Sequence, residues 1–193
     1  LARNNAVTKE GDTTTSPSVK KFGTSSAYFD GTTDRLVVDH SGSLNLRNTD
    51  FTIEGWFYLA DTSEPIRLVY STGGTGTRSG WLIYATSGAF QFWASSVTNA
   101  WNIASGKSLG SRTNGAWVHL AVTREGGTFR CFQNGTQTST FTSDKSLYTD
   151  PDEQIAIGGW AGSGNIQYLN GYIDDLRIIK GHAKYTANFT APT

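Results

Sequence analysis

Residues 129–138 read Phe-Arg-Cys-Phe-Gln-Asn-Gly-Thr-Gln-Thr, two strand-like runs separated by the dipeptide Asn134-Gly135. An Asn-Gly pair between two such runs supplies the two positive φ angles that a type I′ turn needs. This turn joins antiparallel strands, because its twist matches theirs. The segment therefore predicts a β-hairpin and, with it, an antiparallel sheet.

Short runs of alternating apolar and polar residues continue on both sides of this segment, and each run ends at Gly, Asn, Asp, Ser or Thr. In the run 117–123, Val118, Leu120 and Val122 share one face, because side chains alternate along a strand. We expect this face to point into a core and the face with His119 to point outward. No run shows helical periodicity. The expected strands span residues 19–22, 27–29, 35–38, 51–59, 66–71, 81–84, 90–94, 101–104, 117–123, 129–133, 137–141, 155–157 and 172–179.

Length and composition favour one all-β domain. The chain has 193 residues, which suffices for a single domain with a sizeable core. Sixteen Lys and Arg balance sixteen Asp and Glu, so no net charge attracts the protein to nucleic acid or to an anionic membrane. Only 17% of the residues are charged, too few to cover long solvated helices. We expect one sandwich domain over residues 1–193, with 1–16 as a candidate edge strand and 180–193 as a candidate docking arm.

The single cysteine limits the redox and metal chemistry. Cys131 excludes an intramolecular disulfide and any zinc site built on several thiolates. It lies in an apolar stretch, so we expect a buried thiol. No run of about 18 apolar residues exists that would span a bilayer. The sequence starts at Leu1 and contains no Met, which favours a processed product or a module of something longer.

Six motifs occur in a particular order between residues 22 and 178. They are Phe22-Gly-Thr-Ser-Ser-Ala-Tyr-Phe-Asp-Gly31, Asp34-Arg-Leu36, Phe51-Thr-Ile-Glu-Gly-Trp56, Trp117-Val-His-Leu-Ala-Val-Thr-Arg124, Asn134-Gly135 and Gly171-Tyr-Ile-Asp-Asp-Leu-Arg-Ile178. This order resembles the concanavalin A-like, laminin-G-type jelly roll. The resemblance implies an all-β, two-sheet antiparallel jelly-roll sandwich with one concave face. In that family the face or its rim binds sugars, metals or protein partners.

The end of the chain carries a second resemblance. Residues 181–193 are similar to the endings of such modules in tailed-phage virion proteins, especially those of cyanophages. Other members of the family are secreted adhesion proteins or accessory domains of glycan-active enzymes. The resemblance therefore implies a virion surface or an extracellular location. The implied partners are a surface glycan, neighbouring virion or surface proteins, or further copies of the chain.

Catalytic patterns are missing from the sequence. Retaining glycosidases need two carboxylates about 5 Å apart, which a strand achieves with acidic residues at alternate positions. Glu54 and Glu64 have no such partner two positions away. The histidines His40, His119 and His182 lie far apart, so a zinc site is not expected, and His119 fits a structural role. We expect no enzyme, with a glycan-active enzyme as the third hypothesis.

A structural calcium ion is a candidate cofactor. Members of the wider fold often hold an ion with an Asp of the last strand and with carbonyl groups of an early turn. The resemblance implies Asp30, Gly31 and Asp174 as metal ligands here, and their oxygens are of the type that calcium prefers. The alternative is that Asp30 only forms its turn and that Asp174 bonds backbone groups. Equal thermal midpoints in EDTA and in excess calcium would show that no ion stabilises the fold.

Two clusters of aromatic residues in polar, Gly-rich loops suit saccharide binding. Aromatic faces stack on sugar rings, while amides and hydroxyls bond the sugar hydroxyls. The candidate ligand-binding residues are Trp93, Trp101, Asn102, Trp160, Asn165 and Tyr168. Trp56 and Trp117 are assigned to the structure instead.

These patterns lead to a non-catalytic recognition or assembly module of a virion or extracellular surface that binds a glycan. The alternative is a purely structural virion decoration or a self-assembling fibre subunit without sugar binding. That alternative predicts lattice contacts and no groove for a saccharide.

Overall fold

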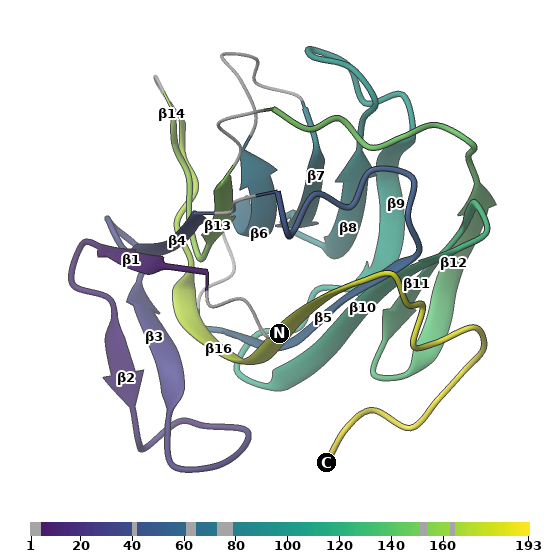
Figure 1. Ribbon diagram of the computed structural model, residues 1–193. Helices are drawn as coiled ribbons and strands as arrows, with labels where there is room; N and C mark the ends of the chain where they lie inside the picture. The colour runs from purple at the N-terminus through teal and green to yellow at the C-terminus, as the bar shows by residue number, and fades with distance from the viewer. Residues whose placement is uncertain (1–4, 40–41, 61–64, 73–78, 151–153, 163–164) are drawn as a thin grey trace.

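The computed structural model describes residues 5–39, 42–60, 65–72, 79–150, 154–162 and 165–193. Within these residues, two seven-stranded antiparallel sheets lie face to face and no helix is present (Figure 1). The predicted two-sheet sandwich is therefore confirmed. No described segment forms a helix that is long and apolar enough to cross a membrane.

We call the two layers sheet A and sheet B. Sheet A contains, in spatial order, β1 (Val7–Glu10), β4 (Arg35–Asp39), β13 (Gln154–Ile157), β6 (Ile66–Thr72), β7 (Trp81–Ala85), β8 (Ala89–Ala94) and β9 (Ala104–Ser111). Sheet B contains β12 (Thr136–Thr142), β11 (Thr128–Gln133), β10 (Trp117–Glu125), β5 (Phe51–Leu59), β16 (Asn170–Lys180), β3 (Ser26–Asp30) and β2 (Thr14–Ser16). A short hairpin pairs β14 (Ala161–Gly162) with β15 (Asn165–Ile166).

One hydrophobic core fills the space between the sheets. Alternation along β5 and β10 turns Ile53, Phe57 and Leu120 inward from sheet B. Alternation along β7 and β8 turns Ile83 and Phe92 inward from sheet A. All five side chains are fully buried. Because both layers supply the core, neither sheet can bury its inner face alone.

The Asn-Gly hairpin forms as predicted between β11 and β12. Asn134 and Gly135 have φ angles of 50° and 81°, and the flanking residues Gln133 and Thr136 pair across the turn. The Asn134 side chain also accepts a hydrogen bond from the His119 backbone N–H at 2.9 Å. The turn is thus tied to the neighbouring strand β10.

Two expected strands are wrong. Residues 19–22 form bends, because the carboxylate of Asp174 accepts the backbone N–H groups of Lys21 and Phe22 at 2.8 and 2.9 Å. The Asp174 side chain thereby accepts hydrogen bonds that the main chain of a neighbouring strand would otherwise accept. The strand expected at 101–104 instead begins at Ala104 and continues to Ser111. This strand contains several Gly and Ser residues, so it lacks the alternation of apolar and polar residues that predicts a strand.

The C-terminal segment 181–193 runs along the outer face of sheet B (Figure 1). The Thr123 hydroxyl donates to the carbonyl oxygen of Tyr185 at 2.8 Å, and the Phe189 N–H donates to the Gly135 carbonyl oxygen at 2.9 Å. The rings of Tyr185 and Phe189 stack on each other and contact Phe132. The segment considered as a docking arm therefore packs on its own sheet.

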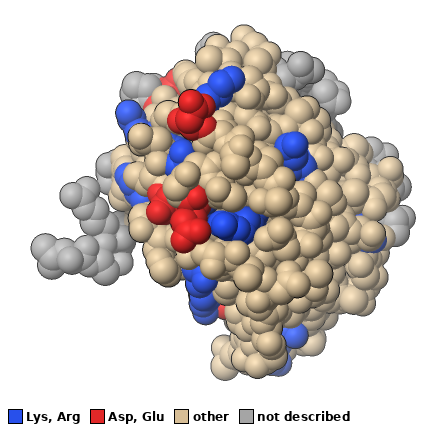
Figure 2. Space-filling view, turned by 90° about the vertical axis from the view of Figure 1, so that its right-hand side faces the viewer, with Lys and Arg blue, Asp and Glu red and all other residues tan. Residues whose placement is uncertain are grey.

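Charged residues are few and mixed in sign on the side of the molecule at the right of Figure 1. Figure 2 shows that acidic and basic side chains lie next to one another there and that most of this side is uncharged. On this side, acidic and basic residues therefore do not form separate patches of opposite charge.

Candidate functional site

The outer face of sheet A carries a row of residues that pair across four strands. The register joins Ala156 to Tyr70, Tyr70 to Leu82, and Leu82 to Trp93. Alternation turns these side chains away from the core. Tyr70, Leu82 and Ala156 are nevertheless at most 5% exposed. Other side chains must therefore cover this row.

Three tryptophans provide that cover. Trp93, Trp101 and Trp160 pack against the row and remain half-exposed. The rings of Trp93 and Trp101 meet edge to face, 5.8 Å apart. Trp160 stands at the base of the β14–β15 hairpin, where it exchanges backbone hydrogen bonds with Gln167. The two aromatic clusters found in the sequence thus come together on one surface, which we call the indole face.

Polar groups lie beside the indoles in a second row. Gln91 pairs with Tyr84, and Tyr84 pairs with Arg67. The Gln91 side-chain oxygen accepts the indole N–H of Trp93 at 3.1 Å. Gln167 donates to the Tyr84 hydroxyl at 3.2 Å and accepts from Arg67 Nε at 2.9 Å. The indole face therefore combines aromatic rings with amide, phenol and guanidinium groups.

The guanidinium of Arg67 lies among aromatic rings. Its central carbon is 4.0 Å from the centre of the Trp160 ring and 5.3 Å from that of Tyr70. Burial lowers the pKa of Arg67, and burial raises the pKa of Tyr70 to about 12. Tyr70 is thus buried beneath the face, whereas Arg67 is only partly shielded from water. Arg67, Tyr70, Tyr84 and Gln167 could not be predicted as site residues, because strand alternation indicates which side a residue faces and not which side chains cover it.

Asn102 serves its own loop. Its side-chain oxygen accepts the backbone N–H of Ser96 at 2.9 Å, and its amide nitrogen donates to the Ser96 hydroxyl at 3.0 Å. These bonds hold the loop that carries Trp101. Asn102 therefore positions an indole. The side chain of Asn165 lies outside the described residues.

Tyr168 lies at one end of the sandwich, in a pocket of about 250 Å³. The pocket is lined by Asp30, Gly31, Thr32, Ile66, Arg112, Tyr168 and Asn170. Tyr168 thus lines the same pocket as Asp30 and Gly31, which the sequence suggested for calcium, and its contact with a saccharide stays a prediction.

The three suggested calcium ligands do not converge. The Asp30 carboxylate bonds its own turn, where it accepts the Thr32 N–H at 2.8 Å, and these bonds lower its pKa. The Asp174 carboxylate holds the loop at Lys21. Asp30 pairs with Asn170, so Asp174 is four residues away, about 13 Å along the strand. Asp30, Gly31 and Asp174 therefore do not surround one shared position, and a structural calcium ion stays a prediction.

A second set of aromatic side chains crosses the outer face of sheet B. The register pairs Trp117 with Tyr58, Tyr58 with Tyr172, and Tyr172 with Tyr28. Neighbouring ring centres are 5.1 to 5.7 Å apart, and all four residues are half-exposed. We call this set the aromatic row. Only the pairing of strands far apart in sequence reveals it.

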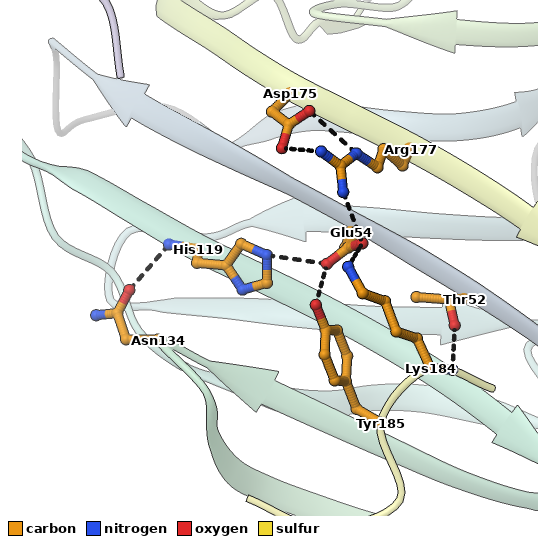
Figure 3. A network of polar contacts seen from close by, with 8 residues as sticks. All are labelled: Thr52, Glu54, His119, Asn134, Asp175, Arg177, Lys184 and Tyr185. Carbon is orange, nitrogen blue, oxygen red and sulfur yellow. Dashed lines mark hydrogen bonds and ion pairs between the residues drawn. The ribbon is translucent and has the colours of Figure 1, made fainter. Parts of the chain in front are cut away.

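A network of polar contacts surrounds Glu54 beneath the C-terminal segment (Figure 3). The carboxylate accepts hydrogen bonds from Tyr185 at 2.7 Å and Lys184 at 2.8 Å, and His119 Nε2 lies 3.3 Å away. Burial alone would raise the pKa of Glu54, but these bonds outweigh it and lower the pKa to about 2. His119 was expected to have a structural role, and its Nε2 atom contacts Glu54 accordingly. Its other ring nitrogen, Nδ1, has no hydrogen-bond partner among the described residues.

Such a carboxylate stays ionised and covered, so it cannot serve as a general acid near neutral pH. Among the described residues, no group of three or more His, Cys, Asp or Glu could hold a metal ion. The contacts of Glu54 with Lys184 and Tyr185 join β5 to the C-terminal segment.

Residues 29–183 match the sequence profile of a family described as the concanavalin A-like lectin/glucanases superfamily. No curated protein sequence matches the chain. Among solved structures, the fold is similar to domain 4 of AbnA, a GH43 extracellular arabinanase from Geobacillus stearothermophilus, in complex with arabinotriose. That similarity has a TM-score of 0.70 and 17% identity over 93% of this chain and 84% of that chain.

The fold is also similar to botulinum neurotoxin binding domains. A type C neurotoxin whose cell entry depends on interaction with two ganglioside molecules aligns with a TM-score of 0.63 and 16% identity, over 93% of this chain and 44% of that chain. The serotype D binding domain aligns with a TM-score of 0.64 and 14% identity, over 92% and 44%. The chain thus spans less than half of these neurotoxin chains, and the likeness shows the fold alone.

Proposed function

Because the chain belongs to the concanavalin A-like lectin/glucanases superfamily, we propose that it is a non-catalytic module that binds a glycan on the indole face. One observation carries the proposal. Trp93, Trp101 and Trp160 converge from separate segments on one surface and stay half-exposed.

The chemistry of this surface suits a sugar. A pyranose ring presents C–H groups on its faces and hydroxyls on its edge, so it needs flat apolar surface and hydrogen-bonding groups side by side. The indoles supply the first. The amides of Gln91 and Gln167 and the hydroxyl of Tyr84 supply the second, held by the bonds described above. The similar domain bound to arabinotriose supports this assignment.

Recognition without catalysis is the second part of the proposal. Glu54, the carboxylate with the most strongly lowered pKa among the described residues, lies under the C-terminal segment on sheet B. The indole face lies on the other sheet. We place the module on a virion or another extracellular surface, where its partners are surface glycans. This location rests on the C-terminal resemblance.

Glycan-array screening of the wild-type protein and three tryptophan variants tests the proposal. Trp93→Ala and Trp160→Ala remove stacking surface, and we expect each to weaken binding about tenfold or more, which corresponds to about 1.4 kcal/mol. Trp117→Ala is the matched control, because Trp117 is a half-exposed indole on sheet B. An array without hits, or equal binding by all four proteins, overturns the proposal.

An assembly role is the second candidate, and the aromatic row favours it. Four half-exposed rings in register form a surface that a second copy or a neighbouring protein could cover. In that case the glycan array gives no hits, light scattering shows self-association of the wild-type protein, and Trp117→Ala reduces this association. A wild-type protein that stays monomeric at high concentration argues against assembly through this row.

A further inference from the structure

The environment of Arg67 suggests which kind of saccharide the indole face accepts. Arg67 projects from β6 onto the indole face, with its guanidinium over the ring of Trp160 and near that of Tyr70. Its Nε atom donates to Gln167, which fixes the plane of the guanidinium. The ring contacts stabilise a cation but add no negative charge to balance it.

Three other arginines of the chain have carboxylate or main-chain carbonyl acceptors. Arg35 lies 2.6 Å from a carboxylate oxygen of Glu10, and Arg177 lies 2.7 Å from one of Asp175. The guanidinium of Arg124 reaches two main-chain carbonyl oxygens. For Arg67, the two terminal Nη groups find neither a carboxylate nor a carbonyl acceptor in the described part of the chain.

A half-buried guanidinium without an anion is unfavourable, because burial removes part of its hydration and no opposite charge compensates. A ligand anion would supply the missing charge. The two Nη groups form a planar fork that matches the two oxygens of a carboxylate. The fork lies next to the indole of Trp160, so one sugar residue can stack on an indole while its acidic group meets Arg67.

We infer that the indole face takes a saccharide that carries an anionic group, and that the Nη groups of Arg67 bind this group. The inference rests on the proposed function and narrows its ligand class. A carboxylate, as in uronic or sialic acids, fits the fork best. A sulfate ester presents the same charge and oxygen acceptors, so the experiment includes both. Gln167 is a positioning residue, because it holds Nε.

Saccharide pairs in which one member carries an acidic group and the other is neutral test the inference by isothermal titration. The pairs are oligogalacturonate and its methyl ester, sialyllactose and lactose, and sulfated lactose and lactose. We expect the wild-type protein to bind the acidic member of at least one pair about tenfold more tightly. Arg67→Gln should remove this difference, and Arg67→Lys should restore part of it, because Lys keeps the charge without the fork.

Arg130→Gln is the control, since Arg130 pairs with Glu125 on sheet B. This variant should bind all five saccharides as the wild-type protein does. Raising the salt concentration should weaken acidic-saccharide binding by the wild-type protein. If Arg67→Gln fails to fold, the affinities of Arg67→Lys and the salt dependence of the wild-type protein still test the inference.

The outcomes separate the inference from the proposed function. Equal wild-type binding of acidic and neutral members, with both weakened by Trp160→Ala, overturns the inference and leaves the glycan-binding proposal standing. A charge preference that persists in Arg67→Gln also overturns it. If the wild-type protein binds no saccharide of any kind, the proposed function itself fails.

Discussion

At the scale of single residues, Glu54 shows how a buried charge is stabilised on the outer face of a sheet. It lies on β5 and is 1% exposed, because Tyr185 and Lys184 of the C-terminal segment cover it. Three neighbours place hydrogen-bond donors around one carboxylate, and the ionised form is favoured in the folded protein. This contact joins two parts of the chain that are 131 residues apart.

Glu54→Gln should therefore destabilise the protein in a pH-dependent way. The folded protein lowers the pKa of Glu54 from its ordinary value of 4.5 to about 2, so the stabilisation is present above pH 4.5 and is lost as the pH falls toward 2. We expect the variant to lose about 2 to 3 kcal/mol of unfolding free energy at pH 7 in urea titrations, and little near pH 2. Glu125→Gln, which affects an exposed pair, should change stability by less than about 1 kcal/mol. A loss that is the same at both pH values would contradict this account.

At the scale of elements, the β11–β12 hairpin also holds the C-terminal segment. Gly135 adopts a positive φ that its turn requires, and its carbonyl oxygen accepts the N–H of Phe189. A Cβ atom at Gly135 would overlap the main-chain carbonyl oxygen of Phe189. Glycine is thus needed twice, once for the turn and once for the close approach of the chain.

The variants Gly135→Ala and Gly126→Ala separate the need for a positive φ angle from the need for space beside the C-terminal segment. Gly126 also has a positive φ, of 53°, but a Cβ atom there meets nothing within 4 Å. We expect Gly126→Ala to cost about 1 kcal/mol of unfolding free energy from backbone strain alone. Gly135→Ala should cost about 2 to 4 kcal/mol and should increase amide hydrogen exchange at Phe189. Equal costs for the two variants would mean that the contact with the C-terminal segment contributes nothing.

At the scale of the whole molecule, the two sheets share one core and should unfold together. Cys131 lies in that core on β11, is fully buried, and packs in the same cluster as Phe92 of sheet A. Burial raises the pKa of the Cys131 thiol to about 11, so the reactive thiolate is scarce in the folded protein.

Thiol labelling tests this cooperativity. We expect Cys131 to react with a disulfide reagent only when the whole domain unfolds, so that the urea midpoint of labelling coincides with that of tryptophan fluorescence. A variant in which the exposed Ser105 is replaced, Ser105→Cys, should react at once at its new thiol. Rapid labelling of the wild-type protein without urea would show that sheet B opens separately.

Much of the fold and part of the candidate site could be predicted from local patterns. The prediction of the Asn134-Gly135 turn was correct, because this turn depends on the φ angles of two adjacent residues. Trp93, Trp101 and Trp160 were identified because each borders a loop of Gly, Ser or Asn residues that water can reach. The expected strand at 19–22 failed for a long-range reason, since Asp174 takes its backbone donors.

Other features needed the pairing of distant strands. Asp30 and Asp174 both looked like ligands of one ion, but the register between β3 and β16 separates them. Tyr28 and Trp117 belong to one row of rings only because β16 and β5 lie between their strands. Nothing in the local sequence around Arg67 distinguishes it from an ordinary exposed strand arginine.

The sequence by itself determined that this chain is all-β and which residues of each strand share a face, because alternation and turn conformation depend on neighbouring residues. The order of its motifs, through the family resemblance, implied the two-layer sandwich. The tertiary structure alone decided that Trp160 meets Arg67 and that Tyr185 meets Glu54. Such contacts depend on which strands and segments become neighbours across long loops. The burial of one whole core selects that arrangement, and no short stretch of sequence contains it.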